Sequence, residues 1–81
     1  MTLSITLSAL ADTTRRQILD LLKKNDLPAG QIGKNFAITA PSLSHHLNAL
    51  KQADLISSRR EGQDEAKEKY IAFVEALKAA D

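Results

Sequence analysis

The chain has 81 residues, 43% of them hydrophobic, and its 11 lysines and arginines against 10 acidic residues give a net charge of +1 at pH 7. A single domain of this size has a marginal core unless a cross-link, a metal or a partner chain adds to it. Because the chain contains no cysteine, disulfides, thiolate metal sites and cysteine nucleophiles are excluded.

The sequence shows no targeting or membrane segment. Serine and threonine interrupt the apolar residues near the N-terminus, no basic lead-in precedes them, and no run of about 18 apolar residues occurs. We therefore expect a soluble cytoplasmic protein with no membrane partner. The net charge alone does not decide whether a polyanion binds. The charge is unevenly distributed along the chain, since residues 1–63 hold eight basic residues against five acidic ones, and residues 64–81 hold three basic residues against five acidic ones.

The first third of the chain predicts two helices. Residues 3–10 form a weak helical segment with apolar residues at 3, 7 and 10, diluted by serine and threonine. Asp12 is the predicted N-cap of a second helix over about residues 13–24, because its carboxylate can accept from the free amides of the first turn. Ile18, Leu19, Leu21 and Leu22 form the predicted buried side of this second helix.

The middle of the chain has the pattern of a helix-turn-helix. Pro28 fits the first turn of a short helix whose Ile32 and Phe36 share a face. Thr39 is the predicted N-cap of the next helix, and Pro41 fits its first turn. Leu43, Leu47 and Leu50 repeat at four and three residues and define one buried stripe. Two helices joined by a tight turn, the second one capped and polar on its outer face, are typical of this motif.

Two adjacent histidines lie on the second of these helices. At 100° per residue, His45 projects opposite the leucine stripe and His46 lies beside the stripe. Metal ligands on one helix are spaced by three or four residues, so this pair predicts no metal site and no cofactor. Ser44 faces another way from His45, and no GxSxG, phosphate loop or HExxH motif occurs, so we predict that the protein is not an enzyme.

His45 has two interpretations, a solvated surface residue or a side chain that contacts DNA bases or phosphates. Its place on the outer face of a second helix of a helix-turn-helix favours DNA contact. His46 is predicted to be partly buried and to pack against the turn.

The stretches ALADTTRRQILDLL and ITAPSLSHHLNALKQADLISSRREGQ resemble the ArsR-type winged helix-turn-helix repressors, dimeric bacterial regulators that release operator DNA when a metal or another signal arrives. The resemblance covers about residues 7–63. It implies a recognition helix led by Ala40 and Pro41, and a β-hairpin wing with Arg59, Arg60 and Gly62 at its tip. The residues predicted to contact DNA are Ser42, Ser44, His45, Pro41, Lys51, Arg59, Arg60 and Arg15.

The basic residues of this set keep an alternative, since for each of them a solvated charge is as good an interpretation as a phosphate contact. Arg16 is also a candidate for a phosphate contact, and it has a third option, a pair with Asp12 or Asp20, which lie at pairing distance along the same helix.

The chain departs from the family pattern at three places. Ala40 stands where many members have glutamine, which removes an amide that can read bases, and Thr13 replaces the usual proline. After REGQ the family continues with an aromatic second wing strand, but this chain reads DEAKEKYIAFVEALKAAD. Its Ala, Glu and Lys content predicts a C-terminal helix over residues 64–80, with Tyr70, Phe73, Val74 and Leu77 along one face.

The predicted fold class is therefore all-α or nearly so, a helix-turn-helix core of about five helices with the wing hairpin lost or truncated. The single domain over residues 1–81 divides into a core over 12–54, a wing remnant or linker over 55–63 and the terminal helix. A less favoured interpretation pairs residues 56–60 with YIAFV as a wing with a long loop. The abrupt change in composition also suggests an engineered derivative of a family member.

The leading functional hypothesis is a repressor-like transcriptional regulator that binds double-stranded DNA as a homodimer. The predicted dimer interface is Leu3, Leu7, Leu10, Tyr70, Phe73, Val74 and Leu77. The alternative is a helical dimerisation or scaffold protein that binds DNA weakly or not at all, which the near-neutral charge favours. No cluster of metal ligands occurs on the helix before the turn or in the tail, so we predict no metal inducer.

Overall fold

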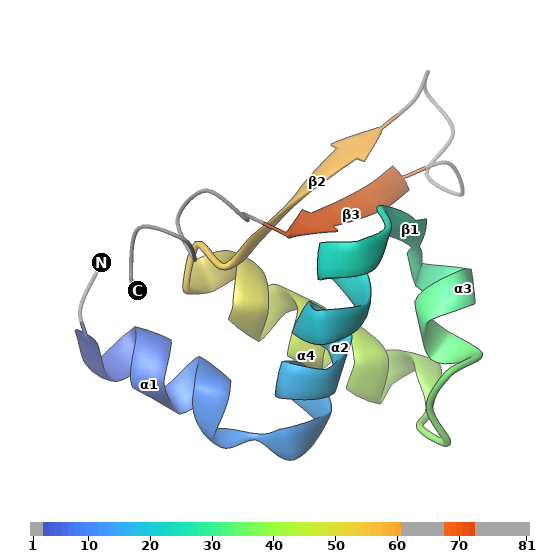
Figure 1. Ribbon diagram of the computed structural model, residues 1–81. Coiled ribbons are helices and arrows are strands. Elements are labelled where there is room, and N and C mark those ends of the chain that lie inside the picture. The colour runs from blue at the N-terminus through green and yellow to red at the C-terminus, as the bar shows by residue number, and fades with distance from the viewer. Residues whose placement is uncertain (1–2, 61–67, 73–81) are drawn as a thin grey trace.

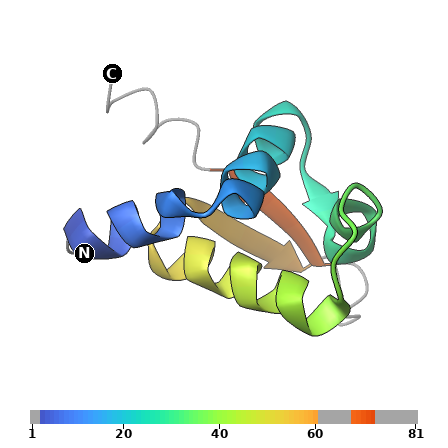
Figure 2. The same ribbon diagram turned by 90° about the horizontal axis from the view of Figure 1, so that it is seen from below.

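The computed structural model describes residues 3–60 and 68–72 of the chain. Within these residues the elements are four helices and three strands (Figure 1). The helices are α1 (Leu3–Ala11), α2 (Thr13–Lys24), α3 (Ala29–Gly33) and α4 (Ala40–Gln52), and the strands are β1 (Leu27–Pro28), β2 (Ile56–Arg60) and β3 (Glu68–Ala72). The two longer strands run side by side along one side of the helices, as both views show (Figures 1 and 2).

Both predicted N-caps are confirmed. The carboxylate of Asp12 accepts a hydrogen bond of 3.0 Å from the backbone N–H of Arg15, so α2 begins at the expected residue. The hydroxyl of Thr39 accepts from the backbone N–H of Ser42 at 3.3 Å at the start of α4. Pro28 lies one position earlier than expected, as the residue that precedes the first turn of α3.

The core is built from the apolar faces that the sequence predicted, with a contribution from the strands. The leucine stripe of α4 is buried, and on α2 Leu21 is half-buried while the other three predicted residues are buried. Ile32 of α3 closes the space between these helices. The buried residues are Ala9, Ile18, Leu19, Leu22, Ile32, Leu43, Leu47, Leu50, Ala53, Leu55, Ile56 and Ala72.

Helix α4 ends in a tight turn that leads into the sheet. The N–H of Leu55 donates to the carbonyl of Leu50 at 3.0 Å, and the N–H of Asp54 donates to the carbonyl of Lys51 at 3.0 Å. This is the Schellman pattern, in which one residue after the helix takes the left-handed conformation that glycine adopts most easily. Asp54 occupies that position with φ 57°. Leu50 and Leu55 are both buried, which is the apolar contact that usually accompanies this turn.

The wing hairpin is present, so the predicted all-α fold with a lost wing is wrong. Strand β2 pairs antiparallel with β3 over five residues, from Ile56 opposite Ala72 to Arg60 opposite Glu68. Strand β1 pairs with the other edge of β3, which gives the strand order β1-β3-β2. The less favoured interpretation, a wing that includes Tyr70 and the residues after it, is the one the structure supports.

The predicted helix over residues 64–80 fails at residues 68–72 for a physical reason. Tyr70 and Ala72 lie on the side of β3 that packs against the core, while Lys69, which precedes Tyr70, is exposed and Ile71 between the two is half-buried. Strand β3 has partners on both edges, so pairing at long range satisfies its backbone and overrides local helix propensity. The predicted positions Phe73, Val74 and Leu77 lie outside the described residues.

Candidate nucleic-acid interface

Helix α4 presents the residues predicted to read DNA on the side away from its buried leucines. Pro41, Ser44 and His45 are exposed, and Ser42 and Lys51 are half-buried. The burial of the opposite face against the core fixes the rotation of the helix about its own axis. As a result α4 offers short polar side chains, which can donate to base edges and phosphates, on one outward surface.

The two histidines differ as the periodicity of the helix predicted. His45 is exposed, whereas His46 is half-buried, and the ring centroids lie 5.9 Å apart. The Nδ1 atom of His46 is buried and has no hydrogen-bond partner within the described residues. The amide of Arg15 that donates to Asp12 lowers the pKa of that carboxyl, and the nearby His46 lowers it as well. His46 thus packs where α4 meets the start of α2.

The wing carries two exposed arginines at the far end of β2. Arg59 lies opposite Lys69 and Arg60 lies opposite Glu68 on the neighbouring strand. In both views this end of β2 lies on the same side of the molecule as the N-terminal end of α4 (Figures 1 and 2). The hairpin therefore places cationic side chains at the end of the protein where α4 begins.

The arginines at the start of α2 bind the end of α1. Arg15 donates from Nε to the carbonyl of Ala9 at 2.9 Å and from Nη2 to the carbonyl of Ser8 at 3.0 Å. Arg16 donates from Nη1 to the carbonyl of Leu10 at 2.7 Å and from Nη2 to the hydroxyl of Thr13 at 3.2 Å. These bonds satisfy carbonyls that the last turn of a helix leaves without partners.

Sequence reasoning missed this arrangement of the two arginines. It left Arg16 open between a phosphate contact and a pair with Asp12 or Asp20, and Asp20 instead accepts from Lys23 Nζ at 3.5 Å. The signal available in the sequence was the one-residue connection between α1 and α2. A helix with no basic residue or glycine at its end is followed after one residue by a helix with arginines in its first turn.

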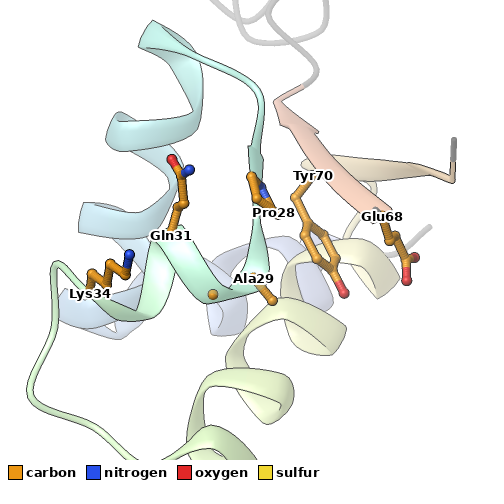
Figure 3. Close-up of a pocket in the computed structure, with 7 residues that line it drawn as sticks. Pro28, Ala29, Gln31, Lys34, Glu68 and Tyr70 are labelled. Carbon is orange, nitrogen blue, oxygen red and sulfur yellow. The ribbon is translucent and has the colours of Figure 1, made fainter. Parts of the chain in front are cut away.

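Two open clefts flank α3 and α4. One of about 640 Å³ lies between α1 and α4, and its lining is Ser4, Ile5, Ser8, Ala9, Arg15, His45, Ala49 and Gln52. The other, of about 380 Å³, lies between α3 and the sheet, and its lining is Pro28, Ala29, Gly30, Gln31, Lys34, Glu68 and Tyr70. Figure 3 shows the Tyr70 ring extending from β3 beside Ala29. Burial, and then the negative charge of Glu68, raise the pKa of Tyr70.

Within residues 3–60 and 68–72, no three histidine or acidic side chains lie together in a set that could hold a metal ion. In the same part of the chain no helix is long and apolar enough to cross a membrane.

The geometry of a capped, outward-facing second helix followed by a two-stranded hairpin is that of a winged helix-turn-helix. The sequence pattern described as bacterial regulatory protein, arsR family, matches residues 12–58. The chain belongs to this family. Its wing is complete over the described strands, which removes the basis for suspecting an engineered derivative.

Two relatives of this ArsR-family chain are named as repressors. It is 60% identical over 55 residues to the transcriptional repressor SdpR of Bacillus subtilis, a match that covers 68% of this chain and 61% of the relative. It is 38% identical over 60 residues to the arsenical resistance operon repressor of Staphylococcus aureus, covering 74% of this chain and 58% of that one. The chain thus spans about three fifths of the length of these relatives.

Solved structures of the family share the fold. An ArsR-like transcriptional regulator from Rhodococcus matches with a TM-score of 0.81 at 28% identity, over 94% of this chain and 69% of that one. The homodimeric winged helix-turn-helix DNA-binding domain of a Mycobacterium bovis protein matches with a TM-score of 0.81 at 30% identity, over 95% of this chain and 68% of that one.

Proposed function

We propose that this protein is a DNA-binding transcriptional regulator that acts as a repressor, with α4 in the major groove of its operator. The observation that carries the proposal is the outward face of α4, where Pro41, Ser44 and His45 are exposed while the leucine face is buried. The relatives named as repressors support the same function. The scaffold alternative, which the near-neutral charge favoured, also assumed a helical chain without a wing, and the wing is present.

The proposed contacts fall into two groups. Ser42, Ser44 and His45 read bases or nearby phosphates, because short donors at the N-terminal half of a recognition helix reach the floor of the groove. Lys51 and the wing arginines contact phosphates, which adds affinity that depends on salt but not on sequence. The small side chain of Ala40 leaves base reading to the three polar residues.

The proposed assembly is a homodimer on a twofold-related site. Helix α1 exposes apolar residues, with Leu3 73%, Ile5 42% and Leu7 58% accessible. An isologous contact between two copies would cover this surface and add to a small core. Leu10 and Tyr70, also predicted for the interface, are half-buried against the core. The homodimeric domain from Mycobacterium bovis supports this assembly for the present chain.

A metal ion is not the effector we propose for this regulator. A chain without cysteine lacks the thiolates that bind soft metals tightly, and our prediction remains that metal does not release the DNA. Titration of zinc into the protein bound to its operator tests this directly, and dissociation at stoichiometric zinc would overturn it. A regulator of this kind works in the cytoplasm and performs no catalysis of its own.

Selection from a randomised duplex pool tests the proposed function. We expect an enriched inverted repeat, which His45→Ala weakens while Asn35→Ala, a change on an exposed residue outside α4, leaves retention unchanged. Removal of the His45 contact should cost about 1–3 kcal/mol and relax the sequence at one position of each half-site. Failure to retain any duplex at low salt, or retention without enrichment, would contradict the proposal.

A further inference from the structure

The joint between α1 and α2 is a single residue held by side-chain hydrogen bonds. Helix α1 ends at Ala11, Asp12 is extended with φ −89° and ψ 128°, and α2 begins at Thr13. One residue alone leaves two rotations free to change the angle between the helices. The guanidinium of Arg15, bound to the carbonyls of Ser8 and Ala9 at 3.0 and 2.9 Å, restrains that angle from the α2 side.

The side chain of Arg15 also lines the cleft between α1 and the recognition helix. It is half-buried there, and His45, Ala49 and Gln52 form the wall contributed by α4. Figure 2 shows α1 lying beside the C-terminal half of α4. The hydrogen bonds from Arg15 to the last turn of α1 therefore fix the direction of α1 relative to α4.

We propose that Arg15 is a positioning residue that sets the separation of the two recognition helices, and so the half-site spacing that the protein accepts. This inference rests on the proposed function, a dimer joined through the exposed apolar residues of α1. In a twofold dimer, the path from one α4 to the other runs through both copies of α1. A change in the angle between α1 and α4 is therefore applied twice across the operator.

An arginine suits this task because its planar fork donates along two fixed directions to two carbonyls. A lysine keeps the charge but donates from one rotatable point, so it holds the end of α1 without fixing its direction. Arg15→Lys consequently separates geometry from charge. Sequence alone predicts a direct phosphate contact for Arg15, and the two roles differ in their salt dependence, because a lost phosphate contact lowers the slope by about 0.9.

The experiment uses the whole chain and its selected operator. Duplexes with the half-sites moved together or apart by one or two base pairs are titrated with wild type, Arg15→Lys and Arg15→Gln. Each added base pair shifts a half-site by about 3.4 Å and rotates it by roughly a tenth of a turn. Lys24→Gln, an exposed charge change at the far end of α2, is the control for charge.

We expect wild type and Lys24→Gln to prefer one spacing by about tenfold, similar to the penalty for one mismatched base pair. Arg15→Lys should reduce this preference to about threefold, with an unchanged half-site sequence and an unchanged salt slope. Loss of fold stability would weaken all spacings equally, so the spacing profile is specific to positioning. If Arg15→Gln does not fold, Arg15→Lys alone decides the result.

An Arg15→Lys protein with the wild-type spacing profile would overturn the inference. A uniform loss of affinity in Arg15→Gln, with a salt slope lower by about 0.9, would assign Arg15 to a phosphate contact instead. If wild type selects no operator at all, the proposed function fails, and that result is distinct from an operator whose spacing Arg15 does not influence.

Discussion

The wing arginines provide the sharpest test of the proposed DNA-binding surface. Replacement of both by glutamine in Arg59→Gln/Arg60→Gln removes two positive charges from the exposed end of β2. Arg59 lies opposite Lys69, a pair of like charges, and Arg60 lies opposite Glu68, a pair of opposite charges, so the two replacements have opposing effects on the stability of the hairpin. We expect the double variant to fold like wild type, which leaves DNA affinity as the quantity that changes.

The size of the effect follows from counterion release. Each lost phosphate contact lowers the slope of log K against log salt by about 0.9, so the double variant should lose about 1.8 from the slope. At about 0.15 M salt, the loss of each contact lowers log K by roughly 0.7. For the pair of contacts, this corresponds to about 2 kcal/mol of binding free energy, or a roughly 30-fold weaker Kd.

Fluorescence anisotropy with the selected operator, from about 50 to 300 mM KCl, measures both the slope and the affinity. The matched control is Lys23→Gln/Lys24→Gln, which removes the same charge at the last turn of α2. Equal slopes for wild type and the wing variant would show that the arginines do not contact phosphate. An equal loss in the control would show that net charge alone attracts the DNA.

The remaining predictions concern stability and assembly. Ile56→Ala truncates a side chain only 2% exposed at the base of the wing, so we expect a loss of about 2–4 kcal/mol and a melting temperature lower by more than about 10 °C; a change of about one degree would mean that β2 does not pack on the core. Asp54→Gly relieves a left-handed backbone at φ 57° and should stabilise by about 0.5–1 kcal/mol, visible as a raised urea midpoint, whereas a lowered midpoint would contradict the strain argument. The Asp12 carboxyl has a folded-state pKa below its ordinary value of 3.8. Its contribution to the free energy of unfolding is therefore present above pH 3.8 and is lost as the pH falls toward the folded-state pKa. Urea midpoints of wild type and Asp12→Asn should therefore converge below about pH 3.8, and a constant gap would refute the link. Leu7→Glu places a charge on the exposed face of α1 and should shift sedimentation toward the monomer, while an unchanged dimer would exclude that face from the interface.

The helical part of the fold was predictable because its signals are local. The leucine stripe of α4 repeats within one helix, and the caps at Asp12 and Thr39 each act on an amide three residues away. The same helical period of 100° per residue placed His45 opposite the leucine stripe and His46 beside it. Local periodicity therefore sufficed for the exposed face of the recognition helix.

The wing was mispredicted because its decisive contacts are far apart in sequence. Tyr70 fits a helical face with later apolar residues, and it also fits an alternating strand with Ala72. Composition rich in Ala, Glu and Lys favoured the helix, but Ile56 faces Ala72 and Leu27 faces Tyr70 in the sheet. Those pairings join three separate parts of the chain, which no local window of sequence contains.

The hydrogen-bond acceptors of Arg15 and Arg16 could not be predicted from the sequence for a related reason. Their bonds to the end of α1 depend on how α1 turns back at Asp12, an angle that hydrophobic periodicity does not encode. The sequence showed the charges and predicted that they face DNA or nearby acids. The structure shows backbone carbonyls as their acceptors.

Helix α1 links the assembly of the protein to its DNA binding. Ala9 is its only buried residue, and the arginines of α2 supply hydrogen bonds in place of a packed apolar face. In the proposed dimer, the second copy covers Leu3 and Leu7 and so stabilises a helix that has a single buried residue in the monomer. An operator with two correctly spaced half-sites favours that dimer by mass action. Folding of α1, dimerisation and operator binding are then linked equilibria in the proposed dimer.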